Sequence, residues 1–155
     1  MIRKTAINTA WLLLMVALSG LVYIRLAPDD VALVHVAPPS GATPDSPVIG
    51  QGSALFVADF NADPEQMWQM LQQVIQSTPR TKYLAGSVKE GMITFVTRSL
   101  VFGFPDYTTI TVTQNEQGSR VTLFGRLRYG RSDFGVNAKR LRGWVKTLEA
   151  LDQAG

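Results

Sequence analysis

The sequence contains no cysteine and one histidine, and these absences exclude several kinds of chemistry. Without cysteine the chain has no disulfide, no thiol nucleophile and no site for the acyl chains of a lipoprotein. His35 lies in a proline-rich segment, and no cluster of His, Asp and Glu has metal-ligand spacing. A serine nucleophile has no histidine base nearby, and the glycines are too scattered for a phosphate-binding loop. The sequence therefore contains no positive signal for catalysis, a metal or a cofactor.

Charge is absent between residues 5 and 24, a stretch of 20 residues. A helix of that length spans about 30 Å, the thickness of the hydrocarbon core of a bilayer. We therefore predict that residues 1–26 form a single transmembrane helix that anchors the chain. The predicted anchor residues are Trp11, Leu12, Leu13, Leu14, Met15, Val16, Leu18, Leu21, Val22, Tyr23 and Ile24.

The flanking charges predict the orientation of this helix. Arg3, Lys4 and the amino terminus precede it, whereas only Arg25 follows closely. Short positive flanks stay in the cytoplasm, which places the N-terminus inside and the rest of the chain on the periplasmic or extracytoplasmic side of the inner membrane. A cleaved signal peptide is the alternative, since residues 17–19 loosely fit a cleavage site. Apolar residues 21–24 continue past that point, which favours an uncleaved anchor.

Acidic residues are scarce in the rest of the chain. Between residues 80 and 146 there are twelve Lys and Arg but only four Asp and Glu, and the net charge of the chain is +3. On an exported, membrane-tethered protein this excess favours an anionic lipid or a polyanionic envelope component as partner, rather than nucleic acid. A solvated basic face with no partner is the simpler alternative. The sequence identifies no protein partner.

Prolines and glycines define residues 27–52 as a linker before a domain at residues 53–155. Within the linker, the stretch 31–36 is apolar enough that we expect it to lie against the domain or the membrane. Asp63, Pro64 and Gln66 form a helix-start signal, because the carboxylate caps the helix and proline suits its first turn.

Hydrophobic periodicity predicts the elements of the domain. We expect strands at 53–60, 83–87, 92–99, 107–113 and 120–127, with helices at 64–77 and around 141–151. The order β-α-β-β-β-β-α with short connections predicts an α+β fold. Its single antiparallel sheet has about five strands and two helices on one face, and resembles a reduced helix-grip fold.

Three arginines are expected to share one face of this sheet. Arg126 and Arg128 are two residues apart on one strand, and Arg98 lies at the end of another. In a structural interpretation, Asp106 and Asp133 pair with these arginines and hold two loops against the sheet. In a functional one, the arginine row binds a carboxylate or phosphate. The candidate ligand-binding residues are Arg98, Asp106, Tyr107, Arg126, Arg128, Asp133 and Asn137.

Two segments carry a resemblance to a known family. The chain resembles the bacterial membrane-associated family called domain of unknown function 1499. The matching residues are Arg25–Pro28, Thr97–Ser99, Phe102–Tyr107, Gly130, Ser132, Asp133, Gly135–Asn137, Arg140 and Trp144. That family often has serines where this chain has Gly125 and Leu127. The resemblance implies the domain limits and a membrane setting, but no activity.

Three functional hypotheses follow. The first is a non-enzymatic envelope protein that binds a partner or an amphipathic anionic ligand through the arginine region. It predicts a cavity between sheet and helices with these arginines at its mouth. The second is an envelope lipid or glycan hydrolase or isomerase that uses Asp106 or Asp133. It requires one carboxylate that faces a cleft and is itself not paired with arginine. The third is an assembly protein with no ligand, which requires a large exposed apolar patch.

Overall fold

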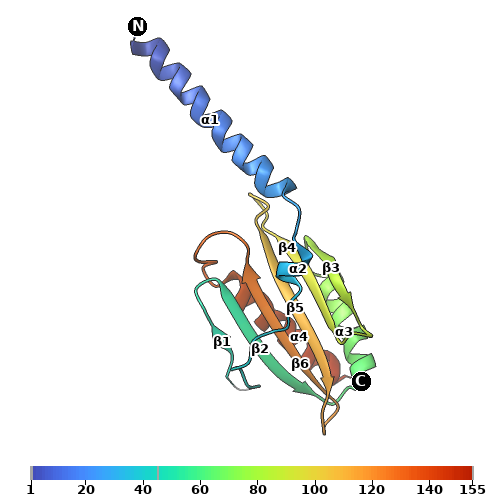
Figure 1. Ribbon diagram of the computed structural model, residues 1–155. Coiled ribbons are helices and arrows are strands. Elements are labelled where there is room, and N and C mark those ends of the chain that lie inside the picture. Colours follow the sequence, from blue (N-terminus) through green and yellow to red (C-terminus); the bar gives the residue numbers. More distant parts are fainter. Residues whose placement is uncertain (1, 45, 155) are drawn as a thin grey trace.

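The computed structural model describes residues 2–44 and 46–154 and shows a projecting helix joined to an α+β domain (Figure 1). The projecting helix, α1, runs from Ile2 to Leu26. Its stretch Arg3–Leu26 is long and apolar enough to cross a membrane, and none of it is buried against the rest of the chain. Helix α1 is therefore a long apolar element whose surface the domain leaves uncovered.

The domain contains one six-stranded sheet with the order β1-β2-β6-β5-β4-β3, and every neighbouring pair is antiparallel. Its strands are β1 (Val48–Ile49), β2 (Ser53–Phe60), β3 (Thr81–Ser87), β4 (Met92–Arg98), β5 (Pro105–Gln114) and β6 (Ser119–Leu127). Short hairpins connect β3 to β4, β4 to β5 and β5 to β6. They place consecutive strands side by side, as the short connections predict.

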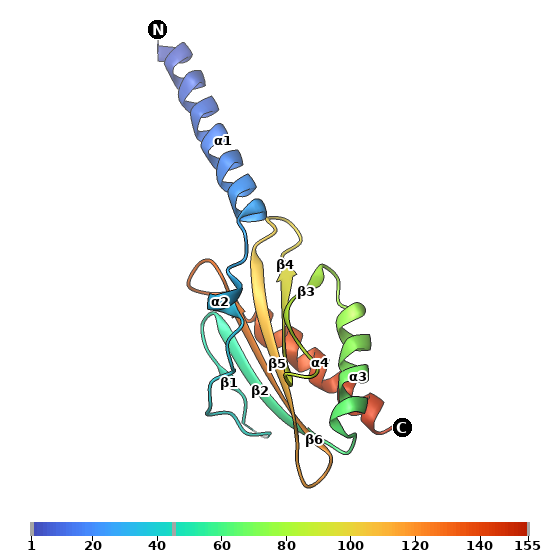
Figure 2. The ribbon, with the colours of Figure 1, turned by 45° about the vertical axis from the view of Figure 1, so that its right-hand side comes forward.

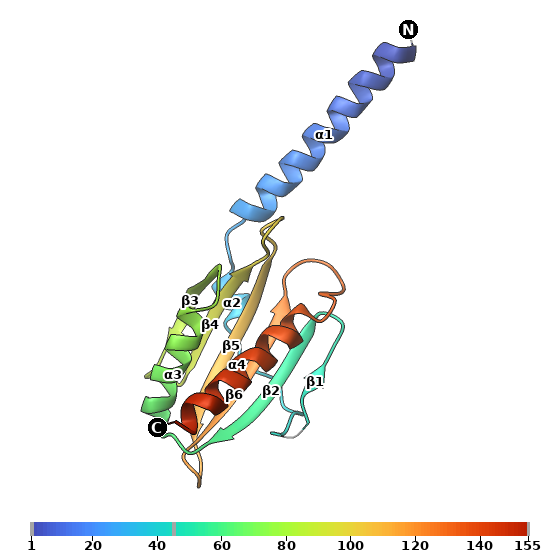
Figure 3. The same ribbon diagram turned by 180° about the vertical axis from the view of Figure 1, so that it is seen from behind.

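Two helices, α3 (Pro64–Gln76) and α4 (Val136–Asp152), cover the same face of the sheet (Figure 3). The Asp63 carboxylate accepts a hydrogen bond from the Gln66 amide at 2.9 Å and caps α3, as predicted. Alternate strand residues point toward the helices and form one core with their apolar stripes. The most deeply buried members of this core are Met67, Leu71, Ile110, Val121, Leu123, Leu141 and Leu148.

The prediction of an α+β fold with one antiparallel sheet and two helices on one face is confirmed. Two short elements, β1 and the four-residue helix α2 (Val31–Val34), were not expected. Both lie in the proline-rich segment between α1 and β2. Figure 2 shows α2 on the face of the sheet opposite α3 and α4. His35 follows α2 and hydrogen-bonds to the buried Thr94 hydroxyl at 2.9 Å, so this segment packs on the sheet.

Candidate functional site

The three arginines lie on the face of the sheet that the helices do not cover, and Asp29 is the anionic partner of two of them, Arg98 and Arg128. Arg128 Nη1 donates to Asp29 Oδ1 at 2.9 Å, and Arg98 Nη2 lies 3.5 Å from Asp29 Oδ2. The Tyr107 hydroxyl donates to the same carboxylate at 2.7 Å. Asp29 comes three residues after the end of α1, so this cluster joins the anchor to the sheet.

The prediction that Asp106 and Asp133 neutralise these arginines is wrong. Asp106 precedes Tyr107 on β5, and successive strand residues point to opposite faces, so its carboxylate lies on the helix side. Asp133 accepts hydrogen bonds from the backbone amides of Gly135 and Asn137 at 3.0 and 2.8 Å, and so caps the first turn of α4. Among the described residues, no hydrogen bond or ion pair joins either carboxylate to the arginine row.

The segment that follows α1 also occupies the rest of the arginine row. Arg126 donates to the Val34 carbonyl and, at 3.2 Å, to the Thr109 hydroxyl. Arg128 Nη2 donates to the Pro28 carbonyl at 2.9 Å. Burial lowers the pKa of Arg126. Burial, and then the hydrogen bond to Asp29, raise the pKa of Tyr107 to about 12. The chain itself therefore fills the sheet face where the sequence suggested a ligand.

A second charged cluster lies on the helix side, around Arg140 of α4. Arg140 Nη1 is 3.6 Å from Asp106 Oδ2, and Asn137 Nδ2 donates to the same oxygen at 3.3 Å. Arg140 also donates to Asn137 Oδ1, and Asn137 is fully buried. The Arg140 side chain is only 10% exposed, and its Nε is buried with no hydrogen-bond partner among the described residues.

Burial shifts both members of this pair toward their neutral forms. It raises the pKa of Asp106, an effect that the nearby Arg140 opposes. It lowers the pKa of Arg140, which the charge of Asp106 opposes in turn. Desolvation outweighs attraction at both groups, so the pair does not fully compensate the cost of burying its charges.

The Arg140 cluster forms one wall of a cavity of about 610 Å³ at the end of the domain nearest α1. Its lining residues are Thr78, Pro79, Arg80, Thr97, Arg98, Ser99, Leu100, Asp106, Val136, Lys139, Arg140, Gly143 and Trp144. Four of them are cationic, and Asp106 is the single carboxylate. We call this hollow the basic cavity. Of the three arginines predicted to bind a ligand, only Arg98 lines the basic cavity.

Arg98 and Arg80 separate the basic cavity from a smaller hollow of about 360 Å³. That hollow also contains Arg25 and Lys82, and no carboxylate lines it. Arg80 has a left-handed backbone, with φ of 57°, and its side chain donates to the Arg98 carbonyl at 3.0 Å. The end of the domain next to α1 is therefore ringed by cations.

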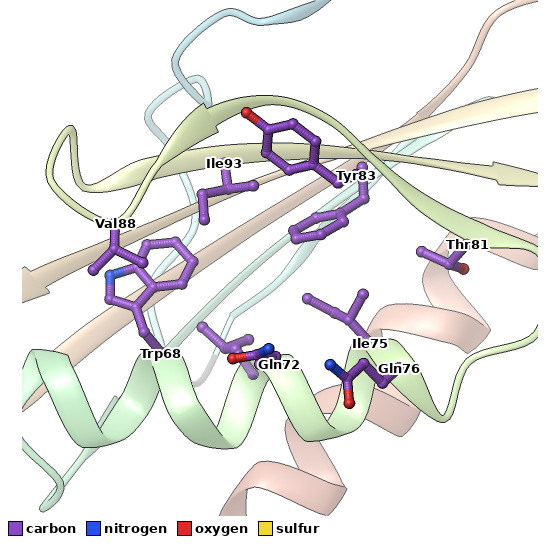
Figure 4. A pocket seen from close by; sticks show the side chains of 10 residues that line it. Trp68, Gln72, Ile75, Gln76, Thr81, Tyr83, Val88 and Ile93 are labelled. Carbon is purple, nitrogen blue, oxygen red and sulfur yellow. The ribbon is translucent and has the colours of Figure 1, made fainter.

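A third hollow, an apolar groove between α3 and β3, lies away from these charges (Figure 4). Trp68 and Ile75 line it from α3, and Tyr83 and Ile93 from the sheet, with the Gln72 and Gln76 amides beside them. Its volume is about 340 Å³, and no Asp, Glu, His, Lys or Arg of the described chain lines it. The groove offers mainly apolar contact, with the Tyr83 hydroxyl and the glutamine amides as its polar groups.

The geometry gives little support for catalysis. Asp106 faces the basic cavity but is engaged by Arg140 and Asn137, and both oxygens of Asp133 accept backbone amides. Asp106 therefore faces a cavity but is paired with arginine, whereas Asp133 is free of arginine among the described residues but does not line the basic cavity. Within residues 2–44 and 46–154, no group of three or more His, Cys, Asp and Glu could hold a metal ion.

Sequence reasoning missed Asp29, Arg80, Lys139 and the role of Arg140 in the cavity. Arg80 and Lys139 carry no local signal, since each is an exposed cation among many. Arg140 was noted only as a family-matching position. The one sequence signal for Asp29 is its place directly after the Arg25–Pro28 stretch that matches the family.

Comparison with known proteins supports the family and the fold. A family model described as "Protein of unknown function (DUF1499)" matches residues 30–148. An uncharacterised protein from Rhizobium leguminosarum has a similar structure, with a TM-score of 0.52 at 8% identity over 66% of this chain and 95% of that one. A protein from Mesorhizobium loti aligns with a TM-score of 0.49 at 13% identity over 65% and 94% of the two chains. No curated protein shows a significant match.

Proposed function

The chain belongs to the DUF1499 family of proteins of unknown function, and from this premise we propose that it is a membrane-anchored, non-enzymatic binding protein whose basic cavity takes the anionic group of an amphipathic ligand. In this proposal α1 spans the inner membrane with its N-terminus in the cytoplasm. The domain lies on the periplasmic or extracytoplasmic side, where envelope lipids and anionic envelope polymers are the available ligands.

The buried, under-bonded guanidinium of Arg140 is the observation that carries the proposal. A guanidinium has five N–H donors, and a buried donor without an acceptor costs free energy. Asp106 lies at 3.6 Å, beyond good hydrogen-bond distance, and Nε has no acceptor in the described chain. A phosphate or carboxylate group in the cavity would neutralise the excess positive charge of the lining and lower the cost of keeping the Arg140 guanidinium charged.

The size and lining of the cavity fit the charged headgroup of an amphipathic ligand together with the start of its non-polar part. Its volume of about 610 Å³ lies in the range of small-molecule sites, which is about 300–1,000 Å³. The first turn of α4 borders it through Val136 and Lys139, and the positive end of a helix dipole favours an anion there. Leu100 and Trp144 add apolar surface for the non-polar part of the ligand.

The candidate residues take two roles in this proposal. Arg98, Asp106 and Asn137 shape the cavity, because Arg98 and Asp106 line it and Asn137 orients Arg140. Tyr107, Arg126, Arg128 and Asp133 position it, the first three by holding the segment after α1 on the sheet and Asp133 by fixing the start of α4.

Two lysines on α4 allow a matched test. Lys139 lines the basic cavity, whereas Lys146 lies two turns further along the same helix and does not, and both are exposed. Calorimetric titration of the full chain in neutral maltoside micelles with a short-chain phosphatidic acid should show binding. Lys139→Gln should weaken it by about threefold to tenfold, equivalent to about 1 kcal/mol, while Lys146→Gln changes it little.

Arg140→Gln should lose binding, with thermal unfolding as a check that the domain still folds. Absence of binding to the unsubstituted chain would contradict the proposal. An equal effect of Lys139→Gln and Lys146→Gln would also contradict it, because that result indicates diffuse charge attraction rather than a site.

A further inference from the structure

Large apolar side chains are exposed in two loops at the end of the domain next to α1. In the β4–β5 loop, Leu100 is 72% exposed, Val101 67% and Phe102 49%. In the loop between β6 and α4, Phe134 is 95% exposed. Phe134 has a left-handed backbone, with φ of 52°, a conformation that is uncommon for a bulky residue. Solvent-exposed aromatic and aliphatic side chains at loop tips indicate a surface that binds a membrane or another protein.

The two loops form one surface with the end of the anchor. Arg25, in the last turn of α1, donates to the Val101 carbonyl at 2.8 Å. Phe102 packs on Phe104 with ring centroids 5.8 Å apart, and Phe104 packs on Tyr129 of the other loop at 6.4 Å. Figures 1 and 2 show the β4–β5 loop beside the end of α1 in both views. We call this surface the loop platform; it comprises residues 100–104 and 129–136.

The connection between anchor and domain is short and fixed. Ala27 is buried, its amide donates to the Tyr23 carbonyl at 2.7 Å, and the next residues are held by Arg128. Asp29, bound to the sheet face, is three residues from the end of α1 at Leu26. Three extended residues reach about 10 Å at most. The end of a domain tethered this closely to a membrane-spanning helix reaches the headgroup layer, which is itself several ångströms deep.

Charge around the loop platform matches an anionic lipid surface. Arg25, Arg80, Lys82 and Arg98 line the smaller hollow with no carboxylate among them, and Arg131 is exposed in the second loop. Each Lys or Arg near an anionic leaflet favours binding, and apolar side chains that enter the interface add to it.

We infer that the loop platform docks into the headgroup region of the same bilayer that α1 spans, with Leu100, Phe102 and Phe134 inserted. The basic cavity then opens at the membrane surface, since Leu100 and Val136 belong to both its wall and the platform. The inference rests on the proposed anchoring by α1. It also deepens the proposed function, because it assigns the ligand to the anionic lipids of that leaflet rather than to a soluble anion.

The absence of cysteine allows a direct test with single labelled sites. Full chains carrying Leu100→Cys, Phe134→Cys, Leu18→Cys or Gln117→Cys are labelled with an environment-sensitive fluorophore and placed in nanodiscs of phosphatidylcholine and phosphatidylglycerol. Quenching is compared between lipids with a nitroxide on the acyl chain and a water-soluble paramagnetic chelate. Gln117, exposed in the β5–β6 hairpin at the far end of the domain, is the control for the aqueous phase.

Labels at Leu100 and Phe134 should be quenched by the nitroxide lipid several-fold more than the label at Gln117, and protected from the chelate. If they behave like Gln117 while Leu18 is quenched by lipid, the anchor holds and the docking inference is overturned. If Leu18 is not quenched by lipid either, the anchoring in the proposed function fails together with it.

Discussion

Asp29 connects the segment that follows α1 to the sheet through one carboxylate. It accepts from Arg128 and Tyr107 and lies close to Arg98, and its side chain is only 14% exposed. Removing one partner of a mostly buried ion pair costs more than the pair contributes, because the remaining charges stay in a medium of low polarity.

Asp29→Asn should therefore lower the free energy of unfolding of the full chain in micelles by about 1–3 kcal/mol. Chemical denaturation followed by tryptophan fluorescence measures this change. Asp30→Asn is the matched control, since Asp30 is exposed, and asparagine keeps an oxygen that can accept from the Ala32 amide. Equal effects of the two substitutions would show that the Asp29 contacts do not stabilise the fold.

Tyr107 makes the same cluster sensitive to high pH. Burial and the Asp29 carboxylate raise its pKa to about 12, so the folded chain keeps the proton after an unfolded chain has lost it near pH 10. The contribution of Tyr107 to the free energy of unfolding is therefore fully present below the unfolded-state pKa. It is lost as the pH rises to about 12, the folded-state pKa. Stability should fall more steeply between pH 10 and 12 in the parent chain than in Tyr107→Phe. Equal slopes of denaturant midpoint against pH would contradict this assignment.

At the level of elements, the sequence predicted the sheet and both core helices because each has enough residues to show its period. Alternation along β6 also predicted that Arg126 and Arg128 share one face of the sheet, but not that this face is the one away from the helices and the basic cavity. The two-residue β1 and four-residue α2 are too short for periodicity to reveal. Asp29 is 78 and 99 residues from Tyr107 and Arg128, so no local pattern could join them. Asp106 and Asp133 were chosen as partners because they are near the arginines in sequence.

The start of α4 depends on Asp133, because the flanking Gly135 has no side chain to cap the helix. The carboxylate accepts from the amides of Gly135 and Asn137, which places Asn137 and Arg140 at the cavity wall. Asp133→Ala should destabilise the domain by about 0.5–2 kcal/mol and weaken phosphatidic acid binding with it. Asp133→Asn keeps an acceptor oxygen and should therefore lose less stability and less phosphatidic acid binding. Thermal unfolding and titration of both variants test this role, and unchanged values for Asp133→Ala would refute it.

Across the whole molecule, the exposed apolar loops and the cation-lined hollows lie at one end. The α1 terminus, the loop platform and both basic hollows lie together, whereas the opposite end carries the β5–β6 hairpin with an Asp59–Arg120 ion pair at 2.7 Å. Local sequence patterns could not predict this arrangement. It depends on the order of the strands in the sheet, which determines the loops that lie at the same end of the domain.

Native mass spectrometry of the full chain, released gently from its own membrane, tests the central claim most directly. The unsubstituted chain should carry one anionic phospholipid per monomer. Lys139→Gln and Arg140→Gln should reduce or lose this lipid, while Lys146→Gln retains it. A bare chain, or lipid retained equally by all three variants, would contradict a headgroup site in the basic cavity.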